Sequence, residues 1–324
     1  AYRYDPAGEL VGVWDQARGQ TAFQYDPLGQ LLARLPEQAR AEMFRYDPTG
    51  NLYEVGAEEG ARRYEAGNRL VQKGSTSYCW DRSGRLAEKR VVDPATGEAR
   101  VWAYTWNGAG LLATVTRPDG EQVVFAYDPL GRRMVKELRR ASRPGERMQV
   151  YARTRFVWDG DVLVHEVAER AQAAGDPVVA VKTYCFEDDG FSPVAHRDSG
   201  GWFHYINDPI GTPERLIGED GAVACELRRQ AWGRTEVAEG GKTGTALRFP
   251  GQYEDEETGL CYNRFRYYDP EAGRFISSDP IGPAGGLNYY SYTFNPLLWL
   301  IRGGYCQGAT VRFELQSAPL EYPW

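Results

Sequence analysis

The sequence Tyr4-Asp5-Pro6-Ala7-Gly8 decides how this chain folds, because it returns along the chain at a fixed interval. The same pattern stands at 25–29 and 46–50, so its tyrosines are 21 residues apart, and a fourth copy occupies 127–131. Degenerate copies begin with Tyr or Trp at residues 64, 80, 106 and 268. Self-similarity at such a period is typical of proteins built from stacked structural units.

Each residue type in the pattern suits a tight turn between two strands. The aspartate side chain can accept a hydrogen bond from the backbone two residues on, proline fixes φ at the next position, and glycine supplies a positive φ. We therefore expect equivalent turn positions at Gly8, Gly29, Gly50 and Gly131, and a turn role for Asp269 in the late copy. A leucine follows most of the turns and resumes the alternation of inward and outward side chains along a strand.

The repeat unit predicts an all-β fold made of tandem hairpins. Two strands of about 5–7 residues and two turns use roughly 20 residues, which matches the interval. One hairpin cannot bury its own inner face, so neighbours are expected to pair into a continuous, curved and spiralling sheet. The best helix candidate, residues 221–232, itself alternates like a strand. The aromatic residues are expected to pack on neighbouring repeats; stacking on carbohydrate is the alternative.

Composition and charge argue against several classes of function. The net charge is −7 and the sequence pI is near 5.3, which disfavours nucleic acid as a partner. The longest apolar run, residues 297–301, is far shorter than the ~20 residues of a membrane-spanning helix. Five cysteines and three histidines are scattered, so we expect buried, reduced thiols, no metal site and no cofactor. The chain starts at Ala1 without the features of a signal peptide.

The repeats lead into a segment with many fixed positions. Residues 247–253, 257–270 and 273–296 resemble the associated core of the Rhs/YD-repeat family of bacterial polymorphic toxins, and residues 205–213 resemble that family's Gly-Thr-Pro element. The resemblance implies that the repeats form part of a hollow, cocoon-like shell around a C-terminal toxin. It also implies an N-terminal shell half and export machinery, such as a type VI secretion system, as partners. Such proteins are made in the bacterial cytoplasm and delivered to competing cells.

The resemblance divides the chain into four parts. These are regular YD repeats (1–140), divergent Rhs repeats (141–246), the Rhs-associated core (247–301) and a short divergent tail (302–324). The tail has 23 residues, against about 100 for a toxin of domain size, and carries no recognisable nuclease or transferase site. We therefore expect a shell fragment without a working toxin, through truncation, frameshift or loss of the cargo.

In this family the core acts as an intramolecular aspartyl protease that cuts the toxin from the shell. Such chemistry needs two carboxylates that share one proton. Asp279 matches one of them, with Arg266 and Arg274 as candidates to position it, but no Asp occurs from 280 to 324. A remote partner, such as Asp269 or Asp208, would then be required. We expect instead that Asp279 caps a turn and that both arginines form surface or cross-strand ion pairs.

Two other acidic clusters are interpreted as turns. Residues 254–257 read Glu-Asp-Glu-Glu and are expected to form a solvated acidic turn rather than a cation site. Residues 188–190 lack the further ligands of a calcium loop. Neither cluster therefore predicts a metal ion.

Three functions are compatible with these observations. The favoured one is a structural part of a toxin-enclosing shell, and no enzymatic activity is expected. The alternatives are a self-cleaving, vestigial aspartyl-type core and a module that binds carbohydrate or a cell surface. The favoured interpretation predicts an exposed, aggregation-prone edge near Tyr4. It further predicts that Gly29→Val destabilises more than Thr49→Val, and that the chain stays intact through Trp324, with Asp279→Asn leaving its mass unchanged.

Overall fold

The fold is built almost entirely from antiparallel strands, which confirms the all-β prediction. The computed structural model describes residues 1–56, 61–143, 145–172, 175–188, 190–238, 240–293 and 295–297. Its strands form three sheets, and a single turn of 3-10 helix, η1 (Gly282–Gly285), follows them. Among these residues no helix is long and apolar enough to cross a membrane.

The first sheet has six strands in sequence order: β1 (Tyr2–Tyr4), β2 (Leu10–Asp15), β3 (Gly19–Tyr25), β4 (Leu31–Pro36), β5 (Glu42–Tyr46) and β6 (Leu52–Glu54). The second, which we call the wall, has sixteen: β7 (Arg62–Glu65), β8 (Arg69–Lys73), β9 (Thr76–Trp80), β10 (Leu86–Val92), β11 (Ala99–Trp106), β12 (Leu112–Thr116), β13 (Gln122–Tyr127), β14 (Arg133–Arg140), β15 (Gln149–Asp159), β16 (Val162–Arg170), β17 (Val178–Phe186), β18 (Pro193–Asp198), β19 (Gly201–Asn207), β20 (Pro213–Gly218), β21 (Val223–Arg229) and β22 (Thr235–Val237). The third, which we call the core sheet, has four: β23 (Tyr253–Asp255), β24 (Leu260–Asn263), β25 (Arg266–Asp269) and β26 (Arg274–Phe275).

The repeat motif forms the turns at one edge of these sheets. Oδ1 of Asp5 accepts hydrogen bonds from the amides of Ala7 and Glu9, and the amide of Gly8 donates to the carbonyl of Asp5. Gly8 has a φ of +80°, a conformation that only glycine adopts without strain. The same side-chain bonds to the backbone recur at Asp26, Asp47, Asp81, Asn107, Asp128 and Asp208.

The aromatic residue of each motif ties its repeat to the one before. The Tyr25 hydroxyl donates to the carbonyl of Leu10 at 2.7 Å, and Leu10 lies six residues after the preceding motif tyrosine, Tyr4. The same offset holds for the motif aromatics at 46, 64, 80, 106, 127 and 158, and indole nitrogens take the role where Trp replaces Tyr. We call these contacts rungs; the others are Tyr46 to Leu31, Tyr64 to Leu52, Trp80 to Leu70, Trp106 to Leu86, Tyr127 to Leu112 and Trp158 to Arg133.

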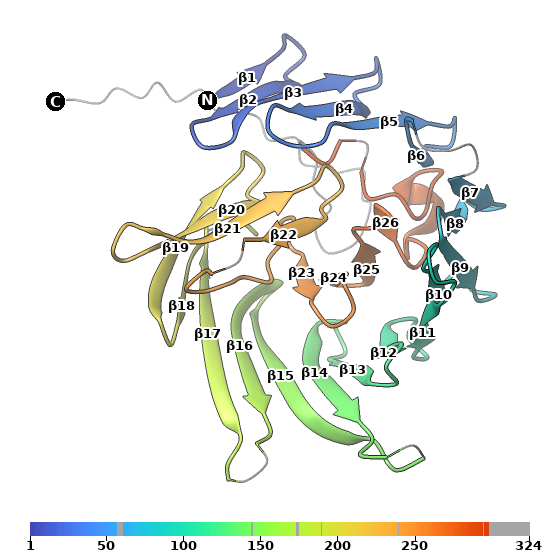
Figure 1. Cartoon of the computed structure of the whole chain (residues 1–324), viewed down its shortest axis with the longest axis vertical. Coiled ribbons are helices and arrows are strands. Elements are labelled where there is room, and N and C mark those ends of the chain that lie inside the picture. The colour runs from blue at the N-terminus through green and yellow to red at the C-terminus, as the bar shows by residue number, and fades with distance from the viewer. Residues whose placement is uncertain are drawn as a thin grey trace.

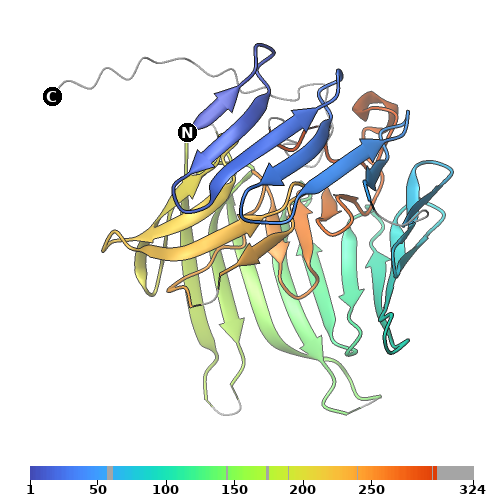
Figure 2. The same ribbon diagram turned by 45° about the horizontal axis from the view of Figure 1, so that its top comes forward.

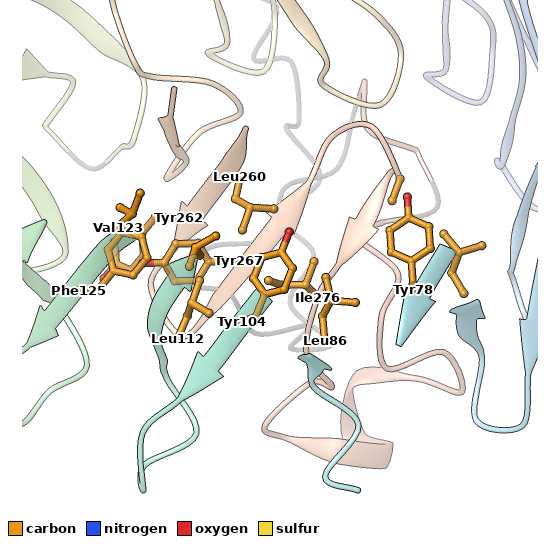
Figure 3. Packing of buried hydrophobic residues seen from close by; sticks show 13 residues of the cluster. Tyr78, Leu86, Tyr104, Leu112, Val123, Phe125, Leu260, Tyr262, Tyr267 and Ile276 are labelled. Carbon is orange, nitrogen blue, oxygen red and sulfur yellow. The ribbon is translucent and has the colours of Figure 1, made fainter. Parts of the chain in front are cut away.

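The wall curves around the core sheet, so the core sheet lies on its concave side (Figure 1). Side chains from both meet in one apolar cluster, in which Tyr78, Tyr104 and Phe125 of the wall lie against Tyr267 and Ile276 of the core (Figure 3). All residues of β24 and β25 are buried, because both faces of the core sheet are covered. The core sheet therefore fills the hollow that the wall would otherwise leave.

The six-stranded sheet lies across one end of the wall (Figures 1 and 2). At its β6 end it is joined to β7 by the rung from Tyr64 to Leu52 and by a bidentate ion pair between Arg62 and Glu54. At its β2–β3 end it meets β20 and β21 only through side chains. There Arg215 binds both oxygens of Asp15 at 2.9 and 2.8 Å, and the Arg18 guanidinium lies 3.1 Å from Glu226.

The prediction of one continuous sheet was wrong. Strand pairing stops between β6 and β7, where the three-residue β6 ends in a turn at Gly56 with φ +80°. The core residues also leave the wall and form a sheet of their own, since their apolar side chains are needed inside the curve. The helix candidate at 221–232 holds strand β21 instead, as its alternation indicated.

Candidate functional site

Asp279 lies at the centre of the core, beyond the end of β26. Its Oδ2 is 3.1 Å from Nη2 of Arg266, and both side chains are essentially inaccessible, at 1% and 0% exposure. Oδ1 accepts a hydrogen bond from the amide of Ile281, while Arg266 lies over the Phe275 ring and also donates to the carbonyl of Tyr289. Asp279 thus caps a turn as expected. Arg266 forms a buried ion pair rather than one at the surface.

The two carboxylates considered as remote partners are each held by a cation of their own. Asp269 is 2.8 Å from Nζ of Lys89 and caps the turn at Glu271 and Ala272. Burial tends to raise the pKa of Asp269, but Lys89 outweighs it, so the pKa lies below its usual range. Asp208 pairs with Arg229. Burial raises the pKa of Asp208 to about 6 despite that partner.

Arg274 is buried, contrary to the prediction of a surface or cross-strand ion pair. Its guanidinium lies between the rings of Tyr64 and Tyr290, at 5.0 and 5.3 Å from their centroids. It donates a hydrogen bond to the carbonyl of Asn68 in the wall. Although Arg274 faces Asp269 across the strands, Lys89 takes that carboxylate, so Arg274 instead fastens the core to the wall.

Asp255 contradicts the expectation of a solvated acidic turn at 254–257. Its side chain is wholly buried, and Nη1 of the equally buried Arg133 lies 2.5 Å from Oδ2. Lys136 lies 3.2 Å from Asp255 and 2.8 Å from Glu257. Burial would lower the pKa of Lys136, but these two carboxylates outweigh it and keep the amine protonated. This cluster bridges the core sheet and β14.

The Arg133 guanidinium is enclosed by aromatic rings. Its carbon atom lies 4.5 Å from the centroids of Phe156 and Tyr262 and 5.2 Å from that of Tyr253. The rings offset part of the cost of burying the charge. No pattern of neighbouring residues indicates this arrangement, because Arg133 and Asp255 are separated by 122 residues.

A cavity of about 1220 Å³ lies between the six-stranded sheet, the wall and the core sheet. Its lining includes Arg34 and Phe44 of the first sheet, Lys89 and Trp102 of the wall, and Leu297. Leu297 also packs in the apolar cluster formed by the inner face of the six-stranded sheet and Trp232. The described part of the chain therefore ends at the wall of this cavity. Residues 298–324, which hold the expected tail, lie outside the described residues.

Nothing in the described part of the chain groups three His, Cys, Asp or Glu side chains as metal ligands. The four cysteines in that part are free; Cys225 and Cys261 are buried, but Cys79 and Cys185 are exposed, which corrects the expectation of buried thiols throughout. The Asp279 carboxylate is buried, and the Arg266 guanidinium and the Ile281 amide hold it in a fixed position.

The curved wall, with the core sheet packed on its concave side, has the architecture of a shell-type repeat protein, and a family model agrees. The model described as Teneurin YD-shell matches residues 8–294, so this chain belongs to that family. The resemblance to Rhs proteins is confirmed by its relatives. The chain is 38% identical to the double-stranded DNA deaminase toxin A of Burkholderia cenocepacia (strain H111), over 95% of this chain and 22% of that protein. It is 34% identical to the probable deoxyribonuclease RhsA of Dickeya dadantii (strain 3937), over 92% and 20%.

The chain thus spans about a fifth of the length of these two relatives. Among solved structures it is similar to the crystal structure of TcdB2-TccC3, with a TM-score of 0.58 and 19% identity. That match covers 94% of this chain and 18% of the other, and it shows a common fold.

Proposed function

We propose that this chain is the C-terminal part of an Rhs-type shell that encloses a toxin and delivers it in competition between bacteria. The observation that carries the proposal is the curved wall, whose concave face holds the core sheet in one region and a cavity in another. The core sheet fills one region of the concave face, and the cavity of about 1220 Å³ remains beside it. Leu297, the last described residue, lines that cavity and packs against the six-stranded sheet and Trp232.

The family supports the same proposal. Two relatives that match this segment are named as a double-stranded DNA deaminase toxin and a probable deoxyribonuclease, and the segment is about a fifth of their length. In the proposal, the toxic activity lies in other parts of such proteins. In the proposal, the other shell half and an export route such as type VI secretion act together with this segment. The wall contributes enclosure, which needs no catalytic residue of its own.

We assign Asp279 and Arg266 a structural role within this function. The carboxylate is bound by a buried guanidinium and by the Ile281 amide, and both remote candidates are engaged elsewhere. The motif aromatics also have a structural role, because their hydroxyl and indole groups are used in rungs. Neither self-cleavage nor carbohydrate binding gains a specific observation in its favour.

The proposal is tested by protease protection in a full-length protein that contains this chain and its cargo. Wild-type protein should shield the cargo from added proteinase K. The double variant Asp15→Ala, Arg18→Ala removes the side-chain contacts to β20 and β21 and should expose it. Arg155→Ala, in an exposed ion pair with Glu169, is the matched control. If the cargo is digested as fast in the wild-type protein as in the double variant, while the wall stays intact, the proposal is overturned.

A further inference from the structure

We propose that residues 240–246 act as a strap on the concave face of the wall, and that His196 is the latch that releases this strap in acid. The strap lies between β22 and Leu247, where the core begins. The proposal goes beyond the shell function and does not rest on it, since it concerns how this segment is held and not what the wall encloses.

The strap has no regular secondary structure, and side chains make most of its polar contacts with the wall. One backbone hydrogen bond joins the amide of Lys242 to a carbonyl of β21 at 2.8 Å. Lys182 of β17 donates to the carbonyl of Gly244. Further contacts run through the hydroxyls of Thr243 and Thr245, and both of these lead to the same histidine.

Five side chains form one line of hydrogen bonds with His196 at its centre. The Thr243 hydroxyl lies 2.7 Å from Oδ2 of Asp198 and 3.1 Å from Nε2 of His196. On the other side of the ring, Nδ1 of His196 is 2.9 Å from the Tyr205 hydroxyl, which is 2.9 Å from that of Thr245. His196 is fully buried, so these are the contacts that its ring nitrogens have in place of water. We call this line the relay.

The hydrogens of the relay can be placed in one direction. The pKa of Asp198 lies below its ordinary value, although burial alone would raise it, so its carboxylate only accepts hydrogen bonds. Thr243 therefore gives its one hydrogen to Asp198, and its oxygen accepts from Nε2–H of His196. A neutral imidazole has a single N–H, so Nδ1 accepts the hydrogen of Tyr205. Thr245 then supplies the hydrogen of the last contact, and every member is satisfied while the ring is neutral.

A proton on His196 puts one hydrogen too many into the relay. Nδ1 becomes a donor, so its contact with Tyr205 and the contact of Tyr205 with Thr245 would together hold three hydrogens. The Thr245 oxygen already accepts from the amide of Leu247 at 3.2 Å. The surplus hydrogen therefore has no acceptor within the relay, and a buried unpaired donor is costly. The contact that gives way is that of Thr245, at the end of the strap next to the core.

The charges around the ring also favour release in acid. Burial, reinforced by Lys182, lowers the pKa of His196 to about 4, while Asp198, 3.6 Å from Nε2, acts in the opposite direction. In the open strap the ring meets water and regains its ordinary pKa of 6.5. Acid therefore favours the open form. Other titratable groups around the relay are Tyr184, whose ring contacts His196, and Glu166, Cys225 and Arg248, which act on Tyr205.

The direction of the relay is tested by nitrogen NMR of the histidine rings at pH 7. The ¹⁵N chemical shifts of a neutral imidazole distinguish which ring nitrogen carries the hydrogen. His196 should be the Nε2–H tautomer. A ring protonated at Nδ1 would reverse the relay and overturn the proposal. This readout does not depend on the stability of any variant.

Release of the strap is tested by hydrogen exchange of the Leu247 amide, which is bonded to the Thr245 hydroxyl. Protection factors are compared at pH 7 and pH 5, because they remove the intrinsic dependence of exchange on pH. With a pKa of about 4 in the closed form and 6.5 in the open form, protection of this amide should fall about twentyfold between the two. Unchanged protection in the wild-type chain would overturn the proposal.

Two variants and one reference strand complete the design. His196→Gln cannot gain a proton, so protection of Leu247 should no longer depend on pH. His165→Gln is the matched control and should keep the wild-type response, because His165 pairs with Thr183 on the opposite face of the wall. The amides of β13 report global unfolding and should stay protected about tenfold or more above Leu247 at pH 5. Equal protection of Leu247 and β13 would mean that the strap does not open by itself, which overturns the proposal.

Discussion

Arg133 of the wall and Asp255 of the core are joined by a buried ion pair of 2.5 Å. Removing the Arg133 guanidinium leaves the buried Asp255 carboxylate with Lys136, at 3.2 Å, as its remaining ion-pair partner. Arg133→Met should therefore lower the free energy of unfolding by about 3–5 kcal/mol. Urea denaturation followed by tryptophan fluorescence measures this.

The matched control is Arg155→Met, which breaks the exposed pair with Glu169 and should cost less than about 1 kcal/mol. The double variant Arg133→Met, Asp255→Leu should recover part of the loss, since no lone charge of the pair stays buried. Equal stability of the Arg133 and Arg155 variants would contradict the assignment of this pair as the main bridge.

Gly29 has a φ of +78°, and an added Cβ would also lie 3.0 Å from the Glu9 carboxylate. A β-branched residue forced into this region costs about 1–2 kcal/mol, so Gly29→Val should lower the melting midpoint. Thr49, the comparison suggested by the sequence, is not neutral, because its hydroxyl lies within hydrogen-bond distance of both Asp47 Oδ1 (2.7 Å) and Asn68 Oδ1 (2.8 Å). Leu28→Val is the better control, because Leu28 is 82% exposed at the same turn. Identical midpoints for both variants would refute the turn assignment.

The buried side chain of His196 should make the folded protein less stable in acid. It is fully buried, with its ring nitrogens 2.9 Å from the Tyr205 hydroxyl and 3.1 Å from that of Thr243. Burial, reinforced by Lys182, lowers its pKa to about 4, although Asp198 acts in the opposite direction. Between pH 6.5 and 4, His196 binds a proton in the unfolded chain but not in the folded chain. Stability should therefore fall by about 3 kcal/mol as the pH drops through this range, and be fully present above 6.5.

The measurement is the difference in unfolding free energy between wild type and His196→Gln at several pH values, which cancels the titration of other groups. This difference should shrink by about 3 kcal/mol from pH 7 to 4. His204→Gln, at an exposed position, serves as the control for the loss of a histidine side chain. A pH-independent difference for His196→Gln would show that the ring is protonated equally in both states.

Asp279→Asn should lower the free energy of unfolding and should not change where the chain ends. The substitution leaves the Arg266 guanidinium buried beside an uncharged amide, which should cost about 3 kcal/mol. Mass spectrometry should find both wild type and variant intact through Trp324. Asp161→Asn, at a carboxylate 62% exposed, is the control for stability. A wild-type species ending between residues 295 and 305, absent from the Asp279→Asn variant, would instead establish a working protease.

The sequence could predict what depends on neighbouring residues. The Asp5 cap and the positive φ of Gly8 need only five consecutive positions, so the turns and the all-β fold followed directly. A further local signal lies in the aromatic position of the repeat, which holds Tyr or Trp in each of the eight motifs from Tyr4 to Trp158. That restriction indicates a required N–H or O–H group.

What the sequence could not predict depends on segments far apart in the chain. Asp255 sits in an acidic run that looks solvated, and only the wall's Arg133, 122 residues away, explains its burial. Arg274 was expected in a surface or cross-strand ion pair for the same reason, since Tyr64 and Tyr290 come together only in the folded protein. Charged residues are assigned to the surface by default, and a buried partner can overturn this.

The sequential order of the wall has a consequence for how the protein acquires its structure. Each wall strand pairs with the strands next to it in sequence, so every step closes a short loop and can follow synthesis of the chain. The core sheet is different, because Lys89 and Arg133 must find Asp269 and Asp255 across 180 and 122 residues. We therefore expect the wall to assemble first. The core sheet then folds last, against the concave side of a wall that is already formed.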